Sequence, residues 1–272
     1  MLRVRLASGV VIITIIGLAF AFGGYFLAGI LLLISLIGYT ELVKALACEE
    51  KHKINGLDII AYVSIVLYYA AAVFTKGHTY LFLALGAFVT AEMIWFVLRF
   101  PVYSNAKLAG SMFSVLYGPV LLSFIYLLRC LDGVEFLVWM VMISSWGCDS
   151  LAYVAGKLLG KHHPFPKLSP KKTTEGCIGG VLGSALIGLL FGLLYVKRFI
   201  PDAFVEWKLA LICGVGGLMG IVGDLAASGI KRNSGIKDFS RLIPGHGGMI
   251  DRFDSMMLCA ATVYILTYLI IF

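Results

Sequence analysis

The sequence predicts an all-α, polytopic integral membrane protein with about nine transmembrane helices. Of its 272 residues, 60% are hydrophobic and 14% are charged, whereas a soluble domain carries about 25% charged residues. The apolar residues form blocks that repeat along the whole chain and leave no polar remainder that could fold by itself. We therefore expect a single integral membrane domain over residues 1–272.

Nine segments are apolar enough to cross a bilayer, for which a helix needs about 20 such residues. The first follows two arginines, as in a signal peptide, but no small-residue cleavage site stands out, so we expect a retained helix. Only two glycines separate it from the second. The nine expected spans are Val4–Phe22, Tyr25–Leu46, Leu57–Phe74, Thr79–Leu98, Ser111–Leu128, Val134–Ala155, Cys177–Val196, Trp207–Ala227 and Ile250–Phe272.

The lysines and arginines assign an orientation to these spans, because they are enriched in cytoplasmic loops. With the N-terminus in the cytoplasm, 17 of the 22 lie on the cytoplasmic side. The C-terminus is then outside. Both long polar loops, Gly156–Gly176 and Ser228–Met249, face the cytoplasm, where nucleotides are found. A compact chain of this kind suits a bacterial cytoplasmic membrane.

The cysteines and the net charge argue against several kinds of site. Six cysteines are scattered singly, without a C-x-x-C pair or clustered histidines, so we expect free thiols and neither zinc nor disulfides. The net charge is +7, but no basic stripe interleaved with aromatics lies outside the spans. We expect membrane lipids and an anionic nucleotide as partners, and no nucleic acid. The cysteines are Cys48, Cys130, Cys148, Cys177, Cys213 and Cys259.

Glycines crowd the seventh and eighth expected spans. Three pairs have the four-residue spacing that lets helix backbones approach closely in lipid. Such packing would also hold the two adjoining polar loops near one another, and glycine-rich faces are compatible with a homodimer. The pairs are Gly179/Gly183, Gly188/Gly192 and Gly216/Gly220.

Four carboxylates lie at one expected depth, at the cytoplasmic ends of spans: Asp149, Asp224, Asp251 and Asp254. Charged groups within a bilayer are costly and usually functional. Several carboxylates at one level form the oxygen-rich set that Mg²⁺ requires, with water and substrate phosphate in the remaining positions. The alternative is that each aspartate is an ordinary residue at a helix end.

Cations and glycines from the same two loops complete a candidate phosphate-handling site. The segment Ile243–Asp254 is a glycine-rich approach to a helix N-terminus, which presents backbone N–H groups to an anion. His246 within it could donate to a phosphate or be a turn residue. Ser228 shares a helix face with Asp224, four residues earlier. The cations are Lys171, Lys172, Lys231, Arg232, Lys237, Arg241 and Arg252.

One further carboxylate, Glu92, lies deep within the fourth expected span. It could line a polar cavity or be hydrogen-bonded to a neighbouring helix, and the sequence leaves both interpretations open.

The run Ser228–Asp254 resembles the long C-terminal signature of the phosphatidate cytidylyltransferase family over about 27 positions. Ser145–Tyr153 and Ser169–Gly176 resemble further family segments, although Thr174 stands where an aromatic residue is expected. The N-terminal half matches only as a hydrophobic multispan region. On this basis we expect an N-terminal multispan region (1–130) and a catalytic region (131–272).

The resemblance implies that an oxygen of phosphatidic acid attacks the α-phosphorus of CTP, which gives CDP-diacylglycerol and pyrophosphate with Mg²⁺ as cofactor. Asp224 and Asp251 would be the leading metal ligands, with Asp254 and Asp149 beside them and a second cation in a two-metal site. Lys231, Arg232 and Arg252 would act with Asp251 as catalytic residues. Substrate binding falls to Lys171, Lys172, Ser228, Lys237, His246, Gly247 and Gly248.

Two other functions are weighed against this one. A CTP-dependent kinase of a polyprenol or similar lipid alcohol would move the γ-phosphate and would need a base for the acceptor hydroxyl. A cation transporter would bind its ion near the midplane of the membrane, often between repeated halves. We find no internal repeat, and the carboxylates lie at one membrane face.

Overall fold

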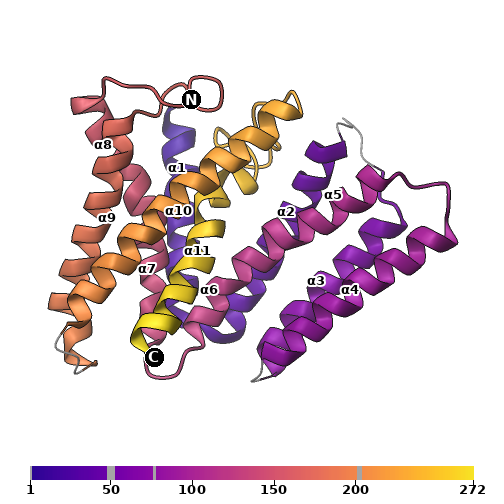
Figure 1. The fold of residues 1–272 in the computed structure, drawn as a ribbon, viewed down its shortest axis with the longest axis horizontal. Coiled ribbons are helices and arrows are strands. Elements are labelled where there is room, and N and C mark those ends of the chain that lie inside the picture. Colours follow the sequence, from indigo (N-terminus) through magenta and orange to yellow (C-terminus); the bar gives the residue numbers. More distant parts are fainter. Residues whose placement is uncertain (1, 48–52, 76–77, 201–203) are drawn as a thin grey trace. The chain divides into compact units, whose positions relative to one another are not determined.

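A computed structural model describes residues 2–47, 53–75, 78–200 and 204–272 (Figure 1). These ranges are mostly helical and contain no strand, apart from an isolated bridge between Ile243 and Gly247. The predicted all-α fold class is confirmed. Cys48 lies outside the described residues, and the other five cysteines are free thiols, as expected.

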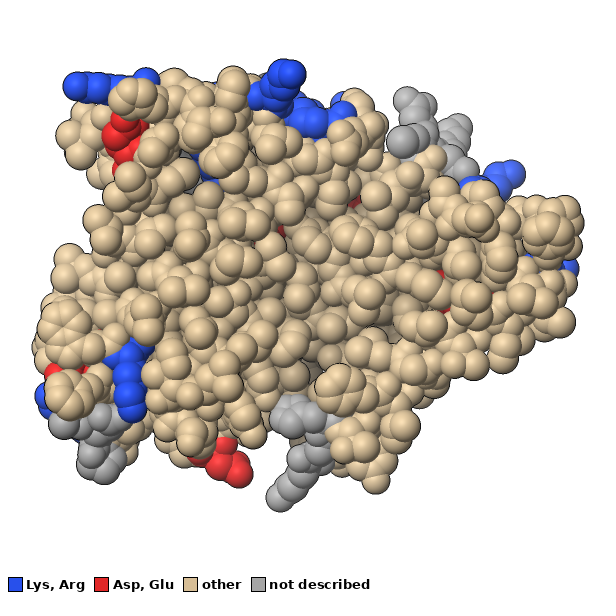
Figure 2. All heavy atoms as spheres, in the orientation of Figure 1, with Lys and Arg blue, Asp and Glu red and all other residues tan. Residues whose placement is uncertain are grey.

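Eight helical segments in the described part of the chain are long and apolar enough to cross a membrane, and they coincide with the second to ninth expected spans. The first expected span corresponds to α1 (Leu2–Phe22), whose described apolar part, Ser8–Phe22, is shorter. On the face drawn in Figure 2 charged side chains are few, as a lipid-facing surface requires. The eight segments are Gly24–Ala47, Gly56–Phe74, Thr79–Leu98, Asn105–Arg129, Glu135–Leu159, Thr174–Arg198, Val205–Asn233 and Ile250–Ile271.

By packing, the chain divides into two compact units. Unit 1 consists of residues 1–130 and 233–252, and unit 2 of residues 131–232 and 253–272. The loop that carries much of the expected signature, residues 233–252, therefore packs with the N-terminal helices rather than with the helices around it in the sequence.

Unit 1 contains α1, α2 (Gly24–Ala47), α3 (Gly56–Phe74), α4 (His78–Leu98), α5 (Asn105–Val115), the π-helical η1 (Leu116–Val120) and α6 (Leu121–Arg129). Gly23 ends α1 with a left-handed φ of 63°, which favours glycine. A capping box begins α3: Asn55 accepts from Leu57 N and Asp58 N, and Asp58 accepts from Asn55 N at 2.8 Å. Helices α3 and α4 then lie side by side (Figure 1).

A buried polar network joins four helices of unit 1. Tyr39 on α2 donates to Asp58 on α3 at 3.1 Å and contacts Ser111 on α5 at 2.9 Å. Ser111 donates to Glu92 on α4 at 2.5 Å, and Glu92 is fully buried. Of the two interpretations of Glu92, the hydrogen bond to a neighbouring helix is confirmed.

Unit 2 is built from η2 (Glu135–Val138), α7 (Trp139–Met142), the π-helical η3 (Ile143–Gly147), α8 (Cys148–Leu159), α9 (Thr174–Leu194), η4 (Val196–Arg198), α10 (Val205–Asn233) and most of α11 (Ile250–Ile271). Helices α8 and α9 pack side by side (Figure 1). A Cβ added at Gly180 would lie 2.8 Å from Ala152 Cβ, and one at Gly188 would lie 2.7 Å from Cys213 Cβ on α10. The close approach that the glycine spacing predicts is confirmed at Gly188, and Gly180, which lies outside the predicted pairs, allows another.

Substituting one of these glycines tests the close approach. We expect Gly180→Ala to lower the free energy of unfolding by about 1–3 kcal/mol, because its methyl group would have to displace α8. Gly86→Ala on α4 is the matched control, since its added methyl would meet no atom within 4 Å. Thermal melts in detergent should show a lower Tm for Gly180→Ala alone, and equal shifts in both variants would contradict this account of the packing.

Candidate functional site

The polar end of unit 2 encloses a cavity of about 500 Å³ between α8, α9 and α10. Aspartates on two helices face the lysines of the loop that joins α8 to α9. The charged and hydrogen-bonding side chains that line it are Asp149, Tyr153, Lys157, His163, Lys171, Lys172, Thr173, Cys177 and Asp224.

Local structure positions the residues that α8, α9 and their connecting loop contribute to this cavity. Asp149 lies in the first turn of α8, directly after η3, and such π-helical turns are frequent at functional sites. Thr173 caps α9 by accepting from Gly176 N at 3.1 Å. Glu175 closes the base of the loop, because its carboxylate accepts from Lys161 N at 3.0 Å and contacts His162 Nδ1 at 2.6 Å. The loop therefore holds its lysines at the cavity.

In the cavity wall, an ion pair joins the loop before α9 to α10. Lys172 Nζ lies 2.8 Å from Asp224 Oδ2. The side chains of Lys172 and Asp224 are 18% and 29% exposed, so the pair is partly open to the cavity. An ammonium group has three N–H donors, so a phosphate in the cavity could bind Lys172 beside Asp224.

Asp254 and Lys231 extend this charged group into the core of unit 2. Asp254 is 8% exposed and interacts electrostatically with Asp224, Lys231 and Asp149. The approach of α11 to α10 depends on Gly223, where a Cβ would lie 2.5 Å from the Asp254 carbonyl oxygen. Lys231 and Ser228 are buried on α10, whereas Lys171 and Arg232 are exposed.

The carboxylates of unit 2 suit a hard cation that is bound together with a phosphate. Asp254 is buried beside the charges of Asp224 and Asp149, and a cation would relieve that repulsion. Within the described ranges, no group of three or more His, Cys, Asp or Glu side chains could hold a metal ion. Mg²⁺ usually takes one or two carboxylates and completes its shell with water and substrate phosphate, so this donor set fits it.

The remaining predicted site residues belong to unit 1. Asp251 Oδ2 accepts from Phe239 N at 2.9 Å and from Gly248 N at 2.8 Å. Gly247 has a left-handed φ of 84°, and a Cβ there would lie 2.8 Å from Asp251 Oδ2. Arg252 follows in the first turn of α11, and Lys237 is exposed in the loop. Asp251 therefore shapes the loop that precedes α11.

His246 contacts the N-terminal helix. Its Nδ1 lies 2.7 Å from Ser8 Oγ on α1, and Ser8 also donates to Pro244 O at 3.3 Å. These contacts give His246 a role in holding the turn, which was one of the two interpretations. Donation to a phosphate stays a prediction.

Sequence reasoning missed Glu41, which is 4% exposed on α2. Its Oε1 accepts from Ser240 Oγ at 2.6 Å and from Met249 N at 2.9 Å, and its Oε2 accepts from Ile250 N at 2.8 Å. The backbone N–H groups expected to face a substrate anion are thus bound, at these two positions, by a carboxylate of unit 1. A charged residue inside an apolar span was the signal that could have found Glu41.

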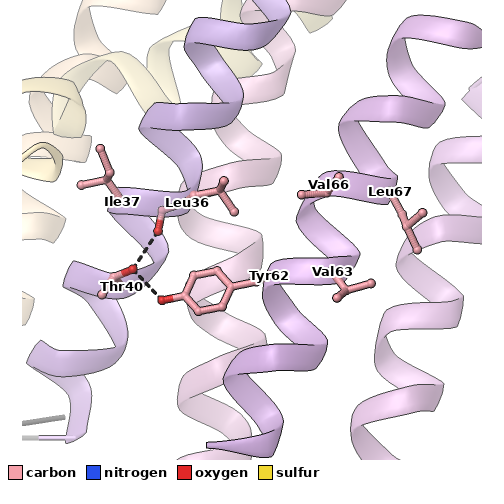
Figure 3. A pocket seen from close by; sticks show the side chains of 7 residues that line it. All are labelled: Leu36, Ile37, Thr40, Tyr62, Val63, Val66 and Leu67. Atoms are coloured by element: carbon pink, nitrogen blue, oxygen red, sulfur yellow. Dashed lines mark hydrogen bonds between the residues drawn. The ribbon is translucent and has the colours of Figure 1, made fainter. Parts of the chain in front are cut away.

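A second cavity of about 510 Å³ lies between α2 and α3 and differs in character (Figure 3). Its two hydroxyl groups satisfy each other: Thr40 Oγ1 lies 2.7 Å from Tyr62 OH and donates to Leu36 O at 2.8 Å. The other lining residues are aliphatic, so this groove offers no charged group for phosphate chemistry. They are Leu36, Ile37, Val63, Val66 and Leu67.

Comparison with known proteins gives one family. The family model described as "Cytidylyltransferase family" matches residues 3–270. A phosphatidate cytidylyltransferase of Staphylococcus haemolyticus is 35% identical over 164 residues, 60% of this chain and 60% of that protein. Proteins of the same name from Staphylococcus epidermidis and Staphylococcus aureus are each 35% identical over 179 residues, 64% of this chain and 66% of theirs. The chain thus spans three fifths to just under two thirds of these relatives.

Proposed function

The chain belongs to the cytidylyltransferase family, and from that membership we propose that it transfers a cytidylyl group from CTP to phosphatidic acid, giving CDP-diacylglycerol and pyrophosphate. Relatives named phosphatidate cytidylyltransferase support this reaction. A multi-pass membrane architecture supports a lipid acceptor. The observation that carries the proposal is the unit 2 cavity, which is lined by Lys171, Lys172 and two aspartates, with Lys172 paired to Asp224 at 2.8 Å.

In the proposed reaction, an ionised phosphatidate oxygen attacks the α-phosphorus of CTP. The bond from that phosphorus to the α–β bridging oxygen breaks, and pyrophosphate leaves with the bond's electrons. Phosphoryl transfer asks the protein chiefly for positioning and charge neutralisation. Because the attacking phosphate is already ionised at neutral pH, the reaction needs no dedicated base.

The residues of unit 2 divide this work between cations and carboxylates. Lys171 and Lys172 would bind the triphosphate at the cavity, and Lys231, whose charge acts on Asp254, would add a further cation. One or two of Asp224, Asp254 and Asp149 would hold Mg²⁺ together with water and substrate phosphate, and the bound ion would neutralise charge on the transferred and leaving groups. The roles of Asp251, Arg232, Arg252, Ser228 and Lys237, and a second cation, rest on the family resemblance.

We further propose the setting in which the enzyme works. The bacterial relatives favour a cytoplasmic membrane protein, and the lysine and arginine distribution favours an N-terminus and active-site loops in the cytoplasm and a C-terminus outside. CTP would then reach the cavity from water, and the lipid would reach it from the adjoining leaflet. A homodimer is compatible with the glycine-rich helix faces.

The experiment that tests this function follows two labels. Purified protein in detergent receives phosphatidic acid, Mg²⁺ and CTP labelled at either the α- or the γ-phosphate. We expect lipid labelled only from the α position, with release of pyrophosphate. Lipid labelled from the γ position, with phosphatidic acid or a polyprenol as acceptor, would instead identify the kinase. No transfer of either label, together with ion flux into lipid vesicles that contain the purified protein, would favour a transporter.

A further inference from the structure

Glu41 holds the start of α11 from a distant helix. Its two carboxylate oxygens accept three hydrogen bonds, from Ser240 Oγ, Met249 N and Ile250 N. We propose that Glu41 is a positioning residue for the transfer reaction: it fixes the backbone at the N-terminus of α11 and thereby orients Asp251 and Arg252, the next two residues. This inference rests on the proposed function.

The hydrogen bonds between Glu41 and the start of α11 satisfy both the helix N-terminus and the buried carboxylate. The first N–H groups of a helix have no acceptor within the helix, and its N-terminus favours a negative charge. A buried carboxylate, in turn, needs donors to offset its lost hydration. Glu41 is 4% exposed, so it and the start of α11 satisfy each other. Because both oxygens are used, the carboxylate fixes the backbone at two neighbouring amides.

Neighbouring residues make this arrangement tight. A Cβ added at Gly248 would lie 2.7 Å from both Glu41 carboxylate oxygens, so a larger residue at this position of the signature would have to displace the carboxylate. Gly248 N donates to Asp251 Oδ2. The amides of Gly248, Met249 and Ile250 are therefore all held by carboxylates, and the chain entering α11 has little freedom to shift.

Glu41→Gln is the informative substitution. Since each oxygen accepts from a backbone amide, the Gln side chain can replace only one of them and would place its own N–H₂ against the other. We expect kcat for CDP-diacylglycerol formation to fall roughly 10²-fold, as for other displacements of about 1 Å in catalytic groups, with the KM for CTP unchanged. Amide exchange at Met249 and Ile250 should accelerate roughly 10- to 100-fold, while exchange in α8 and α9 keeps its wild-type rate. Glu41→Asp, which retains charge and both acceptors, should recover part of the activity.

The matched control is Glu206→Gln, another buried carboxylate near the end of a span, which pairs with Lys197 at 3.1 Å in unit 2. It should keep wild-type kcat. Wild-type kcat in Glu41→Gln would overturn the inference, and so would activity lost together with faster exchange throughout the chain, since that pattern marks a purely structural role.

Ser240→Ala tests the same idea if Glu41→Gln fails to fold, because it removes one donor and leaves the carboxylate in place. We expect a smaller fall in kcat with faster exchange confined to residues 248–250. Faster exchange there with unchanged kcat would overturn the inference. A wild-type protein that transfers no α-label would refute the proposed function itself, whereas an active wild type with an unaffected Glu41→Gln refutes only this inference.

Discussion

Asp224→Asn should lower kcat for CDP-diacylglycerol formation roughly 10³-fold. A bound metal ion stabilises the charge of the transition state by several kcal/mol, and each 1.36 kcal/mol changes the rate about tenfold. The substitution keeps the shape of the side chain and removes its charge, both toward Mg²⁺ and toward Lys172, 2.8 Å away. The measurement is transfer of α-labelled CTP to phosphatidic acid across a range of Mg²⁺ concentrations.

Asp132→Asn provides the control for this loss, since Asp132 is exposed in the loop between α6 and η2. It should retain full activity. Excess Mg²⁺ should restore part of the Asp224→Asn activity if the carboxylate serves the metal. Near-wild-type turnover in Asp224→Asn would remove the aspartate from the proposed metal site.

The second large effect is expected at Asp251, where two substitutions separate charge from loop geometry. Both backbone donors, Phe239 N and Gly248 N, reach the same oxygen, Oδ2. In Asp251→Asn the amide oxygen can take that place, so the loop should persist while the charge is lost. We expect a fall of roughly 10³-fold in kcat if Asp251 serves as a metal ligand, with wild-type amide exchange at Phe239 and Gly248.

Asp251→Ala removes the charge and the acceptor together. Activity should be lost as in Asp251→Asn, and the Phe239 and Gly248 amides should now exchange roughly 10- to 100-fold faster. If Asp251→Asn is fully active and only Asp251→Ala fails, the aspartate holds the loop and its charge plays no part in transfer.

Hydrophobicity located the membrane-embedded parts of the fold but not the ends of its helices. The expected span Ser111–Leu128 lies within the longer helical segment Asn105–Arg129, and Trp207–Ala227 lies within Val205–Asn233. A helix can continue past the hydrocarbon where its backbone hydrogen bonds and a capping residue allow it. At the start of α5, for example, Ser104 caps the helix by accepting a hydrogen bond from Lys107 N at 3.3 Å. The apolar composition of a span therefore does not predict how far its helix extends beyond the hydrocarbon.

The types of residue in the candidate site were predictable, whereas their pairing was not. Aspartates and lysines at polar span ends predicted phosphate chemistry, and the structure brings Asp149, Lys171, Lys172 and Asp224 to one cavity. The pairing of Lys172 with Asp224 depends on how closely α8, α9 and α10 pack, which only the folded chain determines. Glu41 was missed because its partners lie about 200 residues later in the sequence.

The order of synthesis gives the Glu41 contact a consequence for biogenesis. Glu41 and Ile250 are separated by 209 residues, which at 5–20 residues per second is a delay of roughly 10 to 40 s. During that interval α2 is already made and its carboxylate has none of the donors that later surround it. Such a charge is costly in lipid, so we expect the nascent helix to keep Glu41 in contact with water until residues 240–250 emerge. Assembly of unit 1 is thus completed only after that later segment has been translated.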